Sequence, residues 1–197
     1  PSEFSVRVAA NRSIVPLMNA DLIRPMNDLV KKYGSGIQES QLITIDGKVM
    51  AVAFMANTQH LYVRTDVLKE NGIAIPKTYE EVVAASEKIR AAGKMKYPYA
   101  AAYKAGWNLA EEFVNMYIGH GGEFFKSGGA QPNINNAKGV ATLNMLKKLA
   151  DLSNPDYLTH DSEAIKVEWE AGNVAIMTLW ASRSGTLLDD EGDAKIT

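Results

Sequence analysis

The chain has 197 residues, of which 46% are hydrophobic and 22% are charged, a composition typical of a globular protein with a core of its own. The formal net charge of −2 gives no electrostatic reason to expect a nucleic acid or an anionic membrane as partner. No apolar run is long enough to span a membrane, and the absence of cysteine excludes disulfide bonds and thiolate catalysis.

The first third of the chain is predicted to contain a strand, a helix and a β-hairpin. Residues 4–10 alternate between apolar and polar side chains, as strands do, and an apolar helical segment is expected after Ser13. The pair Asp46-Gly47 is typical of a two-residue hairpin turn, and apolar runs flank it. We therefore expect a hairpin with strands at residues 42–45 and 49–54.

A polar segment separates two extended runs between residues 49 and 66. Small and polar residues occupy positions 56–60, and an extended pattern resumes at Leu61. This arrangement is typical of a chain that leaves one layer of structure and enters another. We therefore predict two lobes, at residues 1–61 and 62–197; that the first would be partial and the second nearly whole is what the family resemblance described below implies. The predicted hinge between them consists of Leu61, Tyr62, Val63, Arg64 and Thr65.

The rest of the chain alternates helices with short apolar strands, which predicts an α/β fold. Thr78 and Glu81 have the spacing of a capping box, so a helix is expected to begin there and to end at Gly93. The last apolar run is hydrophobic on both faces and is predicted to be a central buried strand. Further helices are expected at residues 66–70, 108–119, 136–152 and 162–171, and strands at 97–102 and 174–179. The helix at 136–152 is expected to point four residues inward, namely Val140, Leu143, Leu146 and Leu149.

In open α/β sheets, ligands bind beyond the carboxyl ends of the strands, so the residues that follow each predicted strand are candidates for a binding site. They include two indoles and several neutral or cationic hydrogen-bonding groups. Indole faces pack against the C–H face of a sugar ring, and amides and hydroxyls can bind its hydroxyl groups. The candidates are Asn11, Arg12, Asn57, Thr58, Trp107 and Trp180.

Several of these residues also have a purely structural explanation. Trp180 could simply pack under a loop, Arg12 could be a solvated surface group, and Asn57 could serve only in a turn. The third tryptophan, Trp169, lies within a helical apolar stripe and is expected to belong to the core.

The signals for catalysis and metal binding are poor. Glu111 and Glu112 are adjacent on a predicted helix, so they point about 100° apart and cannot form a facing carboxylate pair. The three histidines lack metal-ligand spacing, and neither a phosphate-binding loop nor a GxSxG motif occurs. We predict no catalytic residue, no metal and no cofactor.

Four segments resemble motifs of one family. Asp46-Gly47-Lys48 with residues 51–54 is similar to "DGK-x-YGVPF", with Ala53 in place of proline, and residues 61–68 are similar to "LYYNKDLF" except at 63–65. Residues 71–81 resemble "AGL…PKTWDE" with Tyr79 for tryptophan, and residues 169–177 resemble "F-x-x-GKAAM". In this order, the motifs resemble those of extracellular solute-binding proteins of ABC importers, in the maltose-binding-like group.

The resemblance implies a periplasmic-binding-protein-like two-lobe fold of type II, of which this chain would be a fragment. It also implies that the two lobes close on a saccharide and deliver it to the membrane subunits of an ABC permease. The protein would be a monomer in the periplasm, or lipid-anchored on the outer surface, with no nucleic-acid partner. Asn11, Arg12, Asn57, Thr58, Trp107 and Trp180 would line the cleft.

Alternatives remain open at this stage. Arg12 or Arg183 could accept a carboxylate or phosphate, so Arg183 joins the candidate ligand residues. A polyol or another non-sugar solute could replace the saccharide. The chain could also be a carbohydrate-active enzyme, or an interaction module with an exposed aromatic patch.

Overall fold

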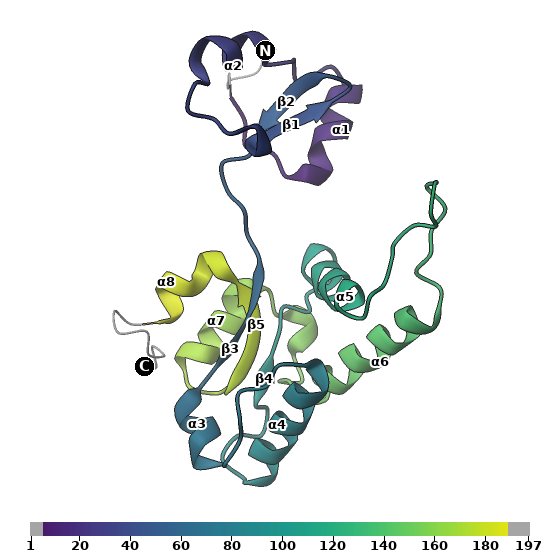
Figure 1. The fold of residues 1–197 in the computed structure, drawn as a ribbon. Helices are drawn as coiled ribbons and strands as arrows, with labels where there is room; N and C mark the ends of the chain where they lie inside the picture. The colour runs from purple at the N-terminus through teal and green to yellow at the C-terminus, as the bar shows by residue number, and fades with distance from the viewer. Residues whose placement is uncertain (1–5, 189–197) are drawn as a thin grey trace. The chain divides into compact units, whose positions relative to one another are not determined.

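The computed structural model describes residues 6–188, and the chain divides into two compact units (Figure 1). Unit 1 extends to Ala56 and unit 2 begins at Asn57. Among residues 6–188, no helix combines the length and apolar character needed to cross a membrane.

Unit 1 is built around a two-stranded hairpin. Its elements are α1 (Asn11–Asn19), α2 (Asn27–Tyr33), the 3₁₀ helix η1 (Glu39–Gln41), β1 (Leu42–Ile45) and β2 (Lys48–Val52). The strands pair antiparallel, and the turn residues Asp46 and Gly47 have φ angles of 49° and 73°, as a type I′ turn requires. The predicted hairpin is therefore confirmed. The Asn27 side chain fixes α2 to it, because Nδ2 donates to the Gly47 carbonyl and Oδ1 accepts from the Val49 N–H.

The strand predicted at residues 4–10 is wrong where the structure describes it. Residues 6–10 have no regular structure, and residues 4 and 5 lie outside the described part of the chain. A strand needs a hydrogen-bonded neighbour, and the described sheet of unit 1 pairs β1 only with β2. Alternation of side chains alone therefore did not produce a strand.

Unit 2 contains a three-stranded sheet surrounded by helices (Figure 1). Its strands are β3 (Gln59–Val63), β4 (Tyr99–Ala100) and β5 (Ile176–Trp180). The order is β3-β5-β4, with β3 antiparallel and β4 parallel to β5, so the predicted central strand is confirmed. Its helices are α3 (Thr65–Glu70), α4 (Tyr79–Ala91), α5 (Trp107–Gly119), α6 (Ala137–Ala150), η2 (Tyr157–Thr159), α7 (Ser162–Glu170), η3 (Ala181–Arg183) and α8 (Ser184–Leu187).

The two faces of this sheet pack against different cores. Ile176 of β5 and Tyr99 of β4 join the residues of α3, α4, α5 and α6 in one core cluster. Met177 and Leu179 join Tyr62 and Trp169 in the other cluster. Trp169 is 1% exposed, which confirms its predicted place in the core.

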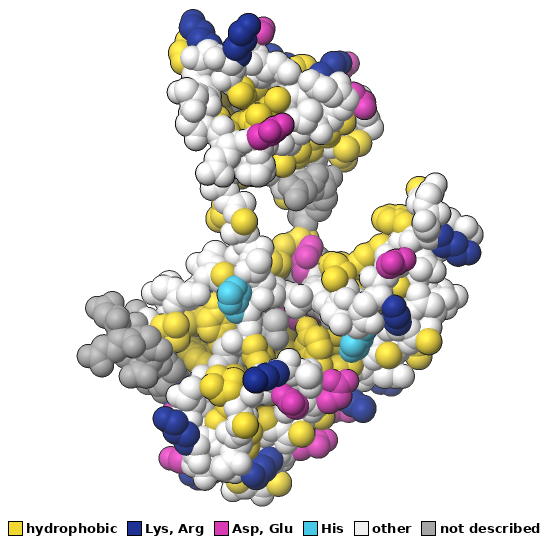
Figure 2. Space-filling model, in the orientation of Figure 1, with side chains coloured by type: hydrophobic (Ala, Val, Ile, Leu, Met, Phe, Trp, Pro, Cys, Tyr) yellow, Lys and Arg dark blue, Asp and Glu magenta, His cyan; other side chains and the backbone are white. Residues whose placement is uncertain are grey.

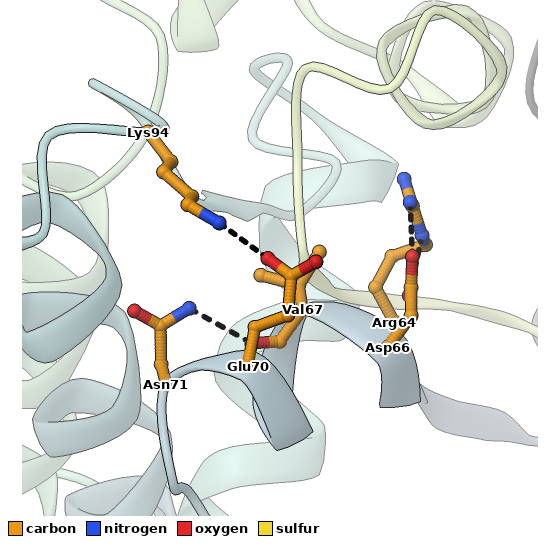
Figure 3. A network of polar contacts seen from close by, with 6 residues as sticks. All are labelled: Arg64, Asp66, Val67, Glu70, Asn71 and Lys94. Atoms are coloured by element: carbon orange, nitrogen blue, oxygen red, sulfur yellow. Dashed lines mark hydrogen bonds and ion pairs between the residues drawn. The ribbon is translucent and has the colours of Figure 1, made fainter.

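The predicted hinge residues lie inside unit 2. Leu61, Tyr62 and Val63 belong to β3 and pair with β5, so the division between the units comes at Ala56/Asn57 rather than after residue 61. Arg64 extends the pairing through its N–H to the Ala175 carbonyl, and its guanidinium binds Asp66 at the start of α3 (Figure 3). That guanidinium lowers the pKa of Asp66. The same figure shows α3 tied at its other end by the Lys94–Glu70 ion pair. The hinge role itself stays a prediction.

The inward face predicted for residues 136–152 is half wrong. Val140 and Leu143 are each 55% exposed, whereas Leu146 and Leu149 are buried. A spacing of three residues advances about 300° around a helix, so each step of the predicted series drifts by about 60°. The face that α6 buries continues instead through Thr142, whose hydroxyl donates to the Lys138 carbonyl and bonds the His120 ring.

The start of α4 follows the capping prediction in one of its two bonds. The Thr78 hydroxyl accepts from the Glu81 N–H at 3.2 Å, as predicted. The Glu81 carboxylate, however, accepts from the Lys77 N–H rather than from that of Thr78. Both bonds nevertheless satisfy backbone donors at the helix start, which would otherwise lack partners.

Replacing Thr78 with alanine is expected to lower the free energy of unfolding by about 1 kcal/mol, because it removes the cap of α4. Urea unfolding followed by circular dichroism measures the change. Thr78→Ser is the matched control, because it keeps the hydroxyl and should retain most of the stability. Equal stabilities of the two variants would contradict the capping role.

Candidate ligand site at the strand ends of unit 2

The carboxyl ends of β4 and β5 bring two tryptophans together. These strands are parallel, so the segments that follow them leave the sheet at the same edge. After β4, the chain turns at Gly106, with a φ of 99°, and α5 begins at Trp107. Trp180 ends β5. The two indoles stack with ring centroids 5.1 Å apart and planes inclined by 20°.

This spacing determines how a ligand could use the pair. A sugar ring between two indoles would need centroids about 7 Å apart, since each carbon–carbon contact takes about 3.5–4.0 Å. At a centroid separation of 5.1 Å, no room remains between the two indoles for the ring of a ligand. Trp107 is 43% exposed. A ligand ring could therefore pack on the outer face of an indole, such as that of the exposed Trp107, but not between the two rings.

Asn57 and Thr58 lie at the same edge of the sheet, but they come before a strand, whereas we expected them to follow one. They precede β3, whose first residue Gln59 pairs with Trp180 across the antiparallel ladder. Asn57 is bound to the loop after β5: its Nδ2 donates to Ser182 Oγ at 3.1 Å, and its Oδ1 accepts from the Ser182 N–H at 3.2 Å. The Thr58 hydroxyl bonds the His60 ring at 2.8 Å.

The other predicted ligand residues belong to α1 and η3. Asn11 and Arg12 begin α1 in unit 1, and their side chains lie outside what the structure describes. Arg183 follows Trp180 in η3, and its guanidinium forms an ion pair with Glu163 at the start of α7. A carboxylate or phosphate ligand would have to compete with Glu163 for this cation. The ligand roles of all these residues stay predictions.

Sequence reasoning missed one buried polar pair beside the tryptophans. Glu112 of α5 is 4% exposed, and its Oε1 accepts from Gln59 Nε2 at 2.7 Å. Its carboxyl group also accepts from the backbone N–H of Ala102, just after β4. Burial is the main cause that raises the pKa of Glu112 to about 8. The signal was present, because Glu112 lies one helical turn before the buried Met116, on the inward face of the helix.

A small cleft adjoins this pair within unit 2. It has a volume of about 240 Å³ and is lined by residues of β3, α4 and α5, including Gln59, Tyr79 and Asn115. Asn115 Nδ2 donates to the Tyr79 hydroxyl across it. In residues 6–188, no three histidine, aspartate or glutamate side chains are arranged to hold a metal ion.

Comparison with known proteins identifies the class. Residues 6–196 match the family described as "Bacterial extracellular solute-binding protein", and the chain belongs to that family. The resemblance drawn from the sequence motifs is thereby confirmed. A probable ABC transporter-binding protein of Deinococcus radiodurans is 29% identical over 143 residues, which are 70% of this chain and 34% of that protein.

Solved structures show the same fold at low sequence identity. Maltose-bound T. maritima MalE3 superposes with a TM-score of 0.80 at 20% identity, covering 91% of this chain and 47% of that one. An ABC transporter solute-binding protein from Agrobacterium radiobacter K84, in complex with ribitol, gives 0.75 at 21% identity, covering 90% and 46%. The predicted α/β fold of periplasmic binding proteins is confirmed, and the chain spans about half the length of these two structures.

Proposed function

We propose that this chain belongs to the substrate-binding component of an ABC importer and that its ligand is a saccharide or a polyol. The observation that carries the proposal is the stacked pair Trp107 and Trp180 at the strand-end edge of unit 2. An exposed indole face packs against the C–H face of a sugar or the carbon chain of a polyol. The hydroxyl of Thr58 and the loop at Ser182 lie at the same edge and supply polar partners.

The charge distribution supports a neutral ligand. On the face drawn in Figure 2, the acidic and basic side chains are interspersed over each unit. The two cations nearest to the tryptophan pair in sequence, Arg183 and Lys104, are already paired with Glu163 and Asp161. A neutral polyhydroxylated ligand needs no such cation, whereas a phosphate or carboxylate ligand would.

The proposal extends to the working context of the whole protein. In it, the protein delivers its ligand to the membrane subunits of an ABC permease, in the periplasm or anchored on the outer surface of the cell. It acts as a monomer and performs no chemistry on the ligand. A carbohydrate-active enzyme would need a carboxylate that can reach its substrate, and Glu112 is buried and held by Gln59.

A thermal-shift screen of mono-, di- and oligosaccharides, polyols and acidic sugars tests the proposal. A ligand at a hundred times its dissociation constant should add about 2.7 kcal/mol of stability to the unsubstituted chain. Trp107→Ala should abolish this shift, because it removes an exposed indole against which the ligand packs.

Trp169→Phe is the matched control, since that tryptophan belongs to the core. This variant should lower the midpoint without ligand and still respond to the ligand. The same screen is run on the complete product of the gene that encodes this chain. Absence of any shift there would refute the saccharide and polyol proposal.

A further inference from the structure

One buried carboxyl group links three elements at the edge where the tryptophans stack. Glu112 is carried by α5, Gln59 begins β3, and Ala102 follows β4. The carboxyl group accepts from Gln59 Nε2 at 2.7 Å and from the Ala102 N–H. Hydrogen bonds to a buried polar group are directional, so they fix the position of the helix against the sheet more sharply than an apolar contact does.

The same three elements determine where the two indoles lie. Gln59 is directly opposite Trp180 in the β3–β5 ladder, so both side chains leave the same face of the sheet. Trp107 is the first residue of α5, on the helix that carries Glu112. The hydrogen bond between Gln59 and Glu112 therefore connects the strand residue paired with Trp180 to the helix that begins at Trp107.

We propose that Glu112 and Gln59 are positioning residues, which hold α5 against the sheet so that Trp107 stacks on Trp180 and keeps its exposed indole fixed for a ligand. The predicted effect on ligand affinity rests on the proposed function. The predicted effect on the stacking of the two indoles rests only on the geometry of unit 2. Loss of the link would remove the hydrogen bonds that Glu112 makes to the sheet side, and the indole at the first residue of α5 would lose its fixed angle.

The chemistry of the pair distinguishes a positioning role from simple filling of space. In Glu112→Gln, the new amide oxygen can accept from Ala102, and the new NH₂ can donate to Gln59 once that amide turns over. In Glu112→Met, a side chain of similar length makes neither bond. A positioning role predicts that methionine disrupts the stack and that glutamine preserves it. A filling role predicts that both variants behave alike.

Two measurements on the 197-residue chain test the inference. The first is the exciton couplet that stacked indoles produce in circular dichroism, recorded without ligand and assigned with Trp107→Phe. The couplet should lose most of its amplitude in Glu112→Met and remain in Glu112→Gln. Glu111→Met is the matched control at the neighbouring, half-buried position and should leave the couplet unchanged.

The second measurement is the affinity for whichever saccharide or polyol the screen identifies. Glu112→Met, which makes neither bond, should bind it about tenfold more weakly, and Glu112→Gln should bind it nearly as the parent does. If Glu112→Met does not fold, Gln59→Met removes the bond to β3 and leaves that to Ala102, and it should weaken the couplet and the affinity in the same direction.

The outcomes separate the two proposals. An intact couplet in the methionine variants, or an equal loss in Glu112→Gln and Glu112→Met, would overturn the positioning role. A collapsed couplet in Glu112→Met with the glutamine variant intact supports positioning even if no saccharide or polyol binds. In that case only the proposed function fails.

Discussion

Replacing Trp169 with alanine is expected to lower the free energy of unfolding by about 3–5 kcal/mol. The indole is 1% exposed in the core between α7 and β5, and it meets the Tyr62 ring edge-on at 6.4 Å. Its N–H donates to the Leu187 carbonyl at 3.3 Å, so truncation leaves both a cavity and an unpaired acceptor. Urea unfolding followed by far-ultraviolet circular dichroism measures the loss.

Trp107→Ala is the control for this prediction. Its indole is 43% exposed and stacks on Trp180, so its removal should cost about 1 kcal/mol. Of two chemically identical substitutions, therefore, one should damage the fold and the other the ligand site. If the two variants were equally destabilised, the assignment of Trp169 to the core and of Trp107 to the site would both be wrong.

The sequence predicted those features of the fold that depend on local chemistry. The hairpin followed from Asp46-Gly47, because few residue pairs adopt two consecutive positive φ angles. The central strand β5 followed from an apolar run without alternation, since both of its faces are covered. Trp169 was assigned correctly because its helix carries one clear apolar stripe.

The errors arose where distant contacts decide the structure. The alternating pattern of residues 6–10 could form a strand only beside a partner, and the described strands of unit 1 provide none. The buried face of α6 includes Thr142, which could not be recognised as buried without knowledge of its hydroxyl's partners. The pairing of β3 with β5 places the whole strand in unit 2, and the lobe boundary after residue 61 stays a prediction.

The candidate site was predicted in its aromatic part and missed in its buried polar part. Trp107 and Trp180 were selected because each follows a predicted strand, and parallel strands end at one edge. Glu112 was considered only as half of a catalytic pair, since sequence spacing shows where two carboxylates point relative to each other. It does not show that Gln59, on a strand 53 residues away in sequence, supplies a hydrogen bond.

The stability of the chain is expected to depend on pH through Glu112. Burial raises the pKa of this carboxyl group from its ordinary value of 4.5 to about 8 in the folded chain. Between these values the folded chain keeps the proton while the unfolded chain releases it, so the free energy of unfolding falls as pH rises. The contribution of Glu112 is fully present below about pH 4.5 and is lost once the pH exceeds about 8.

Comparison with Glu112→Gln isolates this contribution, because glutamine does not titrate and the other carboxyl and histidine groups are common to both chains. Each unit of pKa corresponds to about 1.4 kcal/mol, so the parent should lose on the order of 3–5 kcal/mol relative to the variant between pH 4.5 and pH 8. Urea unfolding at intervals across this range measures the difference. Parallel curves for the two chains would mean that Glu112 is accessible to water in the folded state. In that case the hydrogen bond to Gln59 would not be the buried link on which the positioning role depends.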